Sequence, residues 1–180
     1  MPRRQPLPRL WMMTDERQGE RLWRALHRLP RGSGVVFRHY SLPPNERRAL
    51  FRRVRTIARS RGLLLLLAGP PDQARLWGAD GSHGRRGPGT SGAGLRSAPA
   101  HDLPEIRKAE ARGADLIFLS PVFPTRSHPG AKSLGPVRFG LLARQTRLPV
   151  VALGGMDARR ARSLAGLGIH GWAAIDAWSD

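Results

Sequence analysis

The chain has 180 residues, of which 40% are hydrophobic, and this favours one globular domain over residues 1–180 with a sizeable core. It has no cysteine, which excludes disulfide bonds and thiol catalysis and fits a reducing cytoplasm, where we expect the protein to act. The sequence has no apolar run near the roughly 20 residues of a membrane-spanning helix, and its basic N-terminus lacks the apolar stretch of a signal peptide. We therefore expect no membrane contact.

The formal net charge is +18, and arginine supplies nearly all of it, since Lys108 and Lys132 are the only lysines. The arginines are spread along expected helix surfaces, for example over residues 47–61, and no aromatic platform accompanies them. We interpret the charge as a solvated basic surface that draws in phosphorylated small molecules. A nucleic-acid-binding domain is the weakest alternative.

The first half of the chain alternates apolar runs with amphipathic segments. A helix is expected over residues 18–29, because Leu22, Trp23, Leu26 and Leu29 share one helical face. Strands are expected at residues 10–14, 34–38, 63–68 and 79–83, and further helices at 43–61 and 72–77.

The second half continues the alternation. Asp102 and Asp157 are placed to cap the helices that follow them, and Glu105 lies three residues after Asp102. Residues 85–94 have the composition of a loop at a point where an α/β barrel usually carries a helix. Strands are expected at residues 95–98, 116–120, 149–153 and 169–175, and helices at 102–112, 137–146 and 158–167.

Eight strands with intervening helices predict an α/β fold, a small TIM (β/α)8 barrel with its final helix and one middle helix reduced or missing. An open doubly wound sheet is the alternative, but no Gly-rich dinucleotide turn follows the first strand. An incomplete eighth unit leaves apolar surface at the barrel seam. We therefore expect a homodimer that covers it.

In such a barrel, the loops after the strands hold the functional residues. These loops carry Asp15; Arg38, His39 and Tyr40; His83; His101; residues 120–128; Gly154 and Gly155; and Asp176. The set includes four of the six histidines and predicts a pocket with one acid–base group and a phosphate-binding loop. For each histidine, simple exposure to solvent is the alternative.

Gly154 and Gly155 are the stronger signal in this set. Without Cβ atoms, their N–H groups can approach a phosphate, and the helix expected just beyond them adds a partial positive charge. A tight turn that needs glycine for its backbone alone is the alternative. Metal binding is not expected, since no His or carboxylate pair has a recognised ligand spacing.

Several segments resemble the thiamine phosphate synthase and thiazole tautomerase family. Residues 113–130 read GADLIFLSPVFPTRSHPG and residues 148–156 read LPVVALGGM, where the family has a GADY strand, a G-P-V-F-x-T loop and an I-P-V-V-A-I-G-G strand. Upstream, DQARLWGADGSHG (72–84), LWMMTDE (10–16) and GVVFRHY (34–40) match further family motifs in order. The resemblance implies the TIM barrel of that family.

The chain departs from the family where synthases bind Mg²⁺ and pyrophosphate. Of the V-Q-x-R-x-K residues that hold pyrophosphate, Arg38 remains, while Val36 and Tyr40 replace the other two. The family's Asn-Asp pair falls on Ala68 and Gly69, and its later Asp falls on Pro88. The resemblance therefore implies Mg²⁺ only if synthase activity is retained, and otherwise no cofactor.

The thiazole phosphate side of the family's pocket is retained. The resemblance assigns phosphate binding to Thr125, Gly154 and Gly155, and it places His128 where the family has a lysine. His101 matches the histidine that acts as the acid–base group in the tautomerase branch.

We therefore expect an enzyme of thiamine biosynthesis that binds a phosphorylated thiazole and is tautomerase-like and metal-independent. Two alternatives stay open: a degenerate barrel that binds a phosphorylated metabolite without catalysis, and an active thiamine phosphate synthase.

Overall fold

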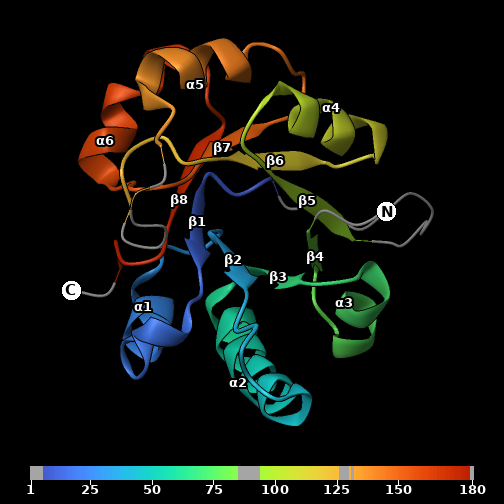
Figure 1. The fold of residues 1–180 in the computed structure, drawn as a ribbon. Coiled ribbons are helices and arrows are strands. Elements are labelled where there is room, and N and C mark those ends of the chain that lie inside the picture. Colours follow the sequence, from blue (N-terminus) through green and yellow to red (C-terminus); the bar gives the residue numbers. More distant parts are fainter. Residues whose placement is uncertain (1–5, 85–93, 126–129, 131, 179–180) are drawn as a thin grey trace.

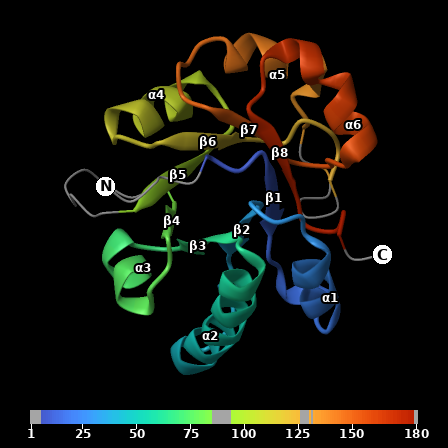
Figure 2. The same ribbon diagram turned by 180° about the vertical axis from the view of Figure 1, so that it is seen from behind.

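The computed structural model describes residues 6–84, 94–125, 130 and 132–178. Eight parallel strands form a closed barrel in which each strand pairs with the next in sequence and β8 pairs with β1. Both ribbon views show the helices outside the ring of strands (Figures 1 and 2). The predicted (β/α)8 barrel is thus confirmed, and the open doubly wound sheet is excluded because the β1–β8 pairing leaves no sheet edge.

All eight predicted strands are present. The strands are β1 (Leu10–Met13), β2 (Gly34–Phe37), β3 (Leu64–Ala68), β4 (Gly81–His83), β5 (Leu95–Ala100), β6 (Leu116–Leu119), β7 (Val150–Ala152) and β8 (Gly171–Ala174). β5 continues beyond its predicted end at residue 98. Pro99 has no N–H to donate, which usually weakens a strand, yet it lies in register opposite Phe118 of β6.

Six α-helices cover the barrel within the described residues. They are α1 (Arg21–Arg28), α2 (Pro44–Arg61), α3 (Pro71–Trp77), α4 (Leu103–Ala111), α5 (Gly135–Ala143) and α6 (Ala158–Ser163), with 3-10 turns η1 (Glu16–Gln18) and η2 (Ala165–Leu167). No helix follows β8 up to residue 178, as predicted for the final unit. The segment predicted to replace a middle helix, residues 85–94, lies almost wholly outside the described part of the chain.

Helix boundaries differ from the sequence prediction for local reasons. The helix predicted to begin at residue 18 begins at Arg21, because Gly19 has a φ of +47° and separates α1 from a 3-10 turn capped by Asp15. The helix predicted to continue to residue 167 ends at Ser163 and passes into a 3-10 turn, which ends at Gly168 with a φ of +72°.

Side chains of the strands divide between two sides of the barrel wall. One set packs inside the ring, where Trp11 and Phe118 meet edge to face with ring centroids 5.3 Å apart. The other set packs against the helices in two clusters, one beneath α1 to α3 and one beneath α4 to α6. β2, β3, β6 and β7 are buried on both faces and are apolar throughout, whereas β4 and β5 also contain polar residues.

The barrel seam between β8 and β1 is covered by the chain itself. Trp178, beyond β8, stacks on Trp172 with ring centroids 5.1 Å apart. Trp178 also packs against the cluster beneath α1 to α3. This indole therefore shields part of the surface that an eighth helix covers in a complete barrel.

We find no helix in the described ranges that is both long and apolar enough to cross a membrane.

Candidate active site

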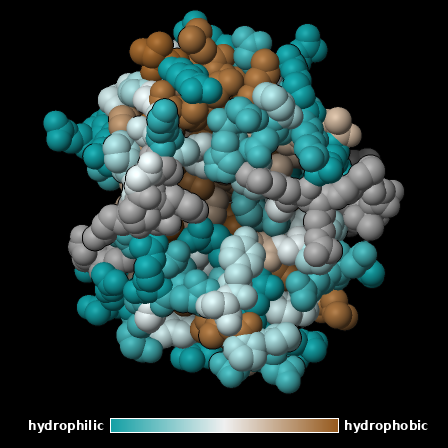
Figure 3. Space-filling model, viewed as in Figure 1, coloured by the Kyte–Doolittle hydropathy of each residue, from teal (hydrophilic) through white to brown (hydrophobic). Residues whose placement is uncertain are grey.

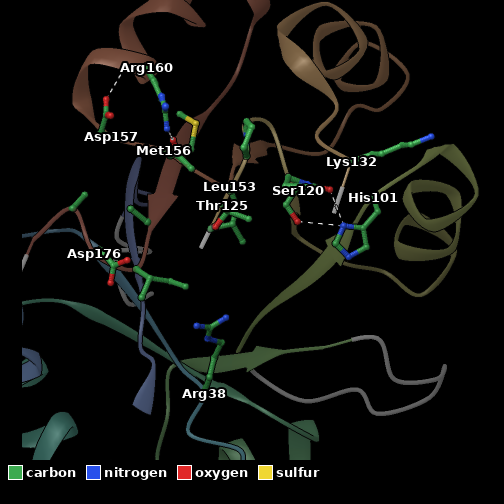
Figure 4. A pocket seen from close by; sticks show the side chains of 17 residues that line it. Arg38, His101, Ser120, Thr125, Lys132, Leu153, Met156, Asp157, Arg160 and Asp176 are labelled. Carbon is green, nitrogen blue, oxygen red and sulfur yellow. Dashed lines mark hydrogen bonds between the residues drawn. The ribbon is translucent and has the colours of Figure 1, made fainter. Parts of the chain in front are cut away.

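A cavity of about 610 Å³ lies at the C-terminal ends of the strands (Figure 4). Its walls come from the loops that follow β2, β5, β6, β7 and β8. It is lined by Arg38, His101, Ser120, Pro121, Pro124, Thr125, Lys132, Leu153, Gly154, Gly155, Met156, Asp157, Arg160, Ala174, Ile175, Asp176 and Ala177.

Five of the six residues predicted to bind or transform the ligand line this one cavity. They are Arg38, His101, Thr125, Gly154 and Gly155. The sixth, His128, lies outside the described residues. The barrel thus brings together residues as far apart in the sequence as Arg38 and Gly155.

His101 directly follows β5 and is held by hydrogen bonds at two points. Its Nδ1 lies 2.7 Å from the backbone oxygen of Ser120, and its backbone N–H donates to Glu105 Oε2 at 2.9 Å. Glu105 is itself fixed, because its N–H donates to the capping carboxylate of Asp102 at 2.9 Å. The predicted Asp102 cap is therefore confirmed, and the first turn of α4 positions the histidine.

The contact with Ser120 determines which nitrogen of His101 can act as a base. A carbonyl oxygen only accepts hydrogen bonds, so Nδ1 must carry the proton and donate it. Nε2 then has a free lone pair, and it makes no hydrogen bond to any residue that the structure describes. The ring can therefore accept a proton from a ligand in the cavity.

Gly154 and Gly155 follow β7 in left-handed backbone conformations, with φ values of +93° and +61°. A Cβ on Gly154 would lie 2.6 Å from Pro121 Cα, and one on Gly155 would lie 2.5 Å from the carbonyl oxygen of Pro124. The turn therefore requires glycine for its own packing. Among the described residues, the N–H groups of these two glycines have no hydrogen-bond acceptor, and they can thus bind an anion in the cavity.

The helix expected to strengthen this anion site is short. α6 has six residues, and Asp157 already caps it by accepting a hydrogen bond from the N–H of Arg160 at 2.8 Å. The cap at Asp157 is therefore confirmed. Its carboxylate offsets the positive helix end, so the backbone amides and nearby cations contribute more to anion binding than the helix dipole does.

Arg38 reaches the cavity from the end of β2 and is anchored to the loop after β1. Its Nη2 lies 2.7 Å from Asp15 Oδ2, and its Nε donates to the backbone oxygen of Thr14 at 2.7 Å. Burial alone would raise the pKa of Asp15, but hydrogen bonds from Arg17 and the charge of Arg38 outweigh it and lower that pKa. The carboxylate is therefore ionised at neutral pH and, shared between Arg17 and Arg38, balances part of the charge of Arg38.

Two of the histidines predicted to lie at the site are buried away from the cavity. His39, with a φ of +45°, bonds through Nδ1 to Thr14 Oγ1 at 2.9 Å and stacks on Phe37. His83 is the last residue of β4, and its Nδ1 bonds to Ser97 Oγ at 2.9 Å. Neither lines the cavity, so neither the pocket role nor the solvent-exposed alternative applies to them.

Burial lowers the pKa of both histidines, and that of His83 falls to about 4. Both are therefore neutral at pH 7. Tyr40, placed in the same group of loop residues by the sequence, is 65% exposed and lies away from the cavity. Asp176, placed at the eighth loop, does line the cavity.

Sequence reasoning missed two cations that line the cavity, Lys132 and Arg160. Lys132 follows the β6 loop and is one of only two lysines in the chain, which is a signal that could have drawn attention to it. The interpretation of the arginines as a solvated basic surface includes Arg160. Its place in the first turn after Gly154 and Gly155 is the signal that separates it from them.

The strand end where the resemblance places Mg²⁺ ligands does not fit a metal. β3 ends at Ala68, followed by Gly69, and neither supplies a carboxylate. Arg47 Nη2 instead donates to the backbone oxygen of Ala68 at 2.7 Å, which places a guanidinium there. In the described ranges, no group of three or more His, Asp or Glu side chains is arranged to hold a metal ion.

Comparison with known proteins places this barrel in a family. A family model described as thiamine monophosphate synthase matches residues 97–178. A protein of Aquifex aeolicus, provisionally named thiamine-phosphate synthase 2, is 32% identical over 179 residues, covering 94% of this chain and 96% of that protein. The chain belongs to the thiamine-phosphate synthase family.

Other members of the family support the same assignment. The thiamine-phosphate synthase of Geobacillus thermodenitrificans is 31% identical over 146 residues, covering 76% of this chain and 66% of that protein. Among solved structures, thiamine phosphate pyrophosphorylase from Pyrococcus furiosus has a TM-score of 0.80 and 26% identity over 96% of this chain and 87% of its own. The predicted family and fold are therefore confirmed.

Proposed function

We propose that this family member binds a phosphorylated thiazole in the cavity and catalyses its tautomerisation in thiamine biosynthesis without a metal ion. The observation that carries the proposal is the 2.7 Å contact between His101 Nδ1 and the Ser120 carbonyl, which leaves Nε2 as a base in the same cavity as Gly154 and Gly155. The relatives are named for thiamine phosphate, in which the thiazole half carries the phosphate.

Tautomerisation needs one group that both removes and returns a proton. Nε2 of His101 would take a proton from one carbon of the ligand and return it to another carbon as the double bond shifts. The ring is positively charged between the two steps, and its Nδ1–H···O bond to Ser120 strengthens in that state. His101 returns the proton that it removes, so the reaction requires no further proton donor, acceptor or co-reactant.

The phosphate is assigned to the opposite end of the ligand, at the turn after β7. The N–H groups of Gly154 and Gly155 would donate to it, with Thr125 beside them in the wall of the same cavity. Arg38 supplies further positive field from the end of β2, although Asp15 balances part of its charge. His128, where the family has a lysine, stays a proposed phosphate contact.

Metal independence is supported by the donor set at β3. A synthase must stabilise a pyrophosphate leaving group, for which a divalent cation is the usual means. Ala68 and Gly69 offer no carboxylate, and the guanidinium of Arg47 at the Ala68 carbonyl would repel a divalent cation. Proton transfer at His101 needs neither the cation nor the pyrophosphate side of the pocket.

Two reaction mixtures test the proposal. In the first, the purified chain is incubated with the thiazole phosphate carboxylate tautomer and EDTA, and the product is followed by NMR. In the second, it receives thiazole phosphate, pyrimidine pyrophosphate and Mg²⁺. We expect turnover in the first mixture alone.

The alternatives predict different outcomes. Thiamine phosphate formed in the second mixture identifies an active synthase and contradicts the proposal. Turnover in neither mixture, together with calorimetric binding of thiamine phosphate, identifies a barrel that binds a phosphorylated metabolite without catalysis.

A further inference from the structure

Arg160 is the cation most closely tied to the glycine turn. One of its guanidinium nitrogens, Nη1, donates to the backbone oxygen of Gly155, and the guanidinium lies 5.0 Å from the centre of the Phe123 ring. Figure 4 shows this side chain extending from α6 toward Met156, beside the cavity that it lines. Its orientation is therefore set before any ligand arrives, which reduces the entropy lost on binding.

Arg160 and Arg38, another arginine that lines the cavity, differ in whether a carboxylate neutralises their charge. Arg38 lies 2.7 Å from the carboxylate of Asp15, which balances part of its charge and also pairs with Arg17. Arg160 has no carboxylate within salt-bridge distance among the described residues. Even its neighbour Asp157 accepts from the backbone N–H of Arg160 and not from the guanidinium.

The guanidinium also retains unused donors. An arginine side chain has five N–H bonds, and within the described part of the chain only Nη1 of Arg160 has an acceptor, the Gly155 carbonyl. Arg160 lines the same cavity as Gly154 and Gly155, whose N–H groups have no acceptor among the described residues. A planar fork of donors with an unbalanced charge suits two oxygens of a phosphate monoester.

We propose that Arg160 is the side chain that binds the phosphate of the ligand, together with the backbone N–H groups of Gly154 and Gly155, and that it sets the preference for a phosphate ester over the free alcohol. This assignment deepens the proposed function and rests on its ligand class. Phe123 and the Gly155 carbonyl are the positioning contacts that hold the guanidinium over the turn.

Calorimetric titration with two ligands tests the assignment. The wild-type chain and Arg160→Ala are each titrated with thiazole phosphate and with the corresponding thiazole alcohol. Arg160→Ala removes charge-assisted hydrogen bonds to the phosphate. We therefore expect its Kd for thiazole phosphate to rise about 10- to 100-fold and its Kd for the alcohol to change little. Arg160→Lys should give an intermediate Kd, because lysine keeps the charge and loses the fork.

Arg159→Ala is the matched control, because it removes the same charge from the neighbouring exposed residue of the same helix. We expect its Kd to change less than about threefold, as is usual for a screened surface charge. Equal losses in Arg159→Ala and Arg160→Ala would mean that only the overall field matters, and would overturn the assignment. An equal loss of affinity for the phosphate and the alcohol in Arg160→Ala would also overturn the assignment, since the side chain would then act by shaping the Gly155 turn.

These results are separable from the proposed catalysis. A wild-type chain that binds the phosphate ester but turns over neither reaction mixture contradicts the catalytic proposal, while a selective loss in Arg160→Ala still supports the Arg160 assignment. A wild-type chain that turns the ester over, with an unchanged Kd in Arg160→Ala, overturns only the assignment. A wild-type chain that binds neither ligand overturns both.

Discussion

Gly154 and Gly155 are required by the backbone whether or not a ligand binds. Both have positive φ values, and a Cβ on either would meet the backbone of the β6 loop. Their presence in the sequence is therefore explained by the turn alone. What would connect them to a ligand is their N–H groups, which have no acceptor among the described residues and belong to a turn that lines the cavity.

We expect an alanine substitution in the Gly154–Gly155 turn to cost more stability than one at another glycine near α6. Gly155→Ala should lower the free energy of unfolding by about 1–3 kcal/mol, because its Cβ would lie 2.5 Å from a backbone oxygen at a φ of +61°. It should also weaken phosphate binding. Gly166→Ala is the control, since a Cβ there meets nothing within 4 Å.

Urea unfolding of the two variants checks this prediction. Gly166→Ala should stay within about 0.5 kcal/mol of the wild type. If Gly155→Ala were as stable as Gly166→Ala and bound phosphate normally, the tight turn described for residues 154 and 155 would be wrong.

Single residues were predictable from the sequence where a loop motif carries them. Thr125 and Gly155 follow strands that the apolar runs reveal, His101 follows the predicted fifth strand, and all three line the cavity. Arg160 was not predictable in this way. Its distinguishing contact with the Gly155 carbonyl depends on how α6 folds back on the turn, which no spacing in the sequence records.

At the scale of elements, the alternation of apolar runs and amphipathic segments was sufficient to find every strand. Which face of a strand points inward was not predictable, because strands buried on both faces lack a polar alternation. His83 shows the consequence. As the last residue of β4 it turns inward against Phe118, with ring centroids 5.2 Å apart, and is withdrawn from the loop where the sequence placed it.

The buried His83 between β4 and β5 predicts a loss of stability in acid. Its pKa is about 4 in the folded chain against an ordinary value of 6.5, so between these values the unfolded chain binds more protons. Above pH 6.5, His83 is neutral in both the folded and the unfolded chain, so its titration does not reduce the free energy of unfolding. Stability is lost as the pH falls from 6.5 to 4, and the loss amounts to about 3 kcal/mol.

Free energies of unfolding measured between pH 7 and pH 4 check this expectation. His83→Gln should lose stability less steeply over that range than the wild type, while retaining part of the slope because burial also lowers the pKa of His39. His27→Gln, which removes an exposed histidine of α1, is the control for loss of a histidine. Identical slopes in the wild type and His83→Gln would contradict the buried, neutral state of His83.

At the scale of the whole molecule, the barrel seam has a cover that the sequence prediction did not include. Trp178 stacks on Trp172, so the reason first given for a homodimer is weakened. Large exposed side chains lie instead on α5, where Val137 is 78% and Leu141 is 60% exposed one helical turn apart. Figure 3 shows hydrophobic residues gathered over this helix, at the top of the view.

A homodimer stays our prediction, now with α5 as the expected contact. Light scattering at micromolar concentration should give about twice the 19.9 kDa mass of one chain. The double variant Val137→Glu with Leu141→Glu should give the mass of one chain, because paired carboxylates would be costly in an apolar interface. A wild-type monomer at that concentration would refute the prediction.

His101 is proposed to transfer a proton on a phosphorylated thiazole without a metal ion. The most direct measurement is NMR of the thiazole phosphate carboxylate tautomer in D₂O with EDTA, with the wild type and with His101→Asn. We predict that the wild type forms the isomer, with deuterium at the newly protonated carbon only to the extent that the proton held on Nε2 exchanges with solvent, and that His101→Asn slows this conversion about 10²- to 10⁴-fold. Equal rates for the two proteins, or conversion by the wild type only after Mg²⁺ is added, would contradict the account.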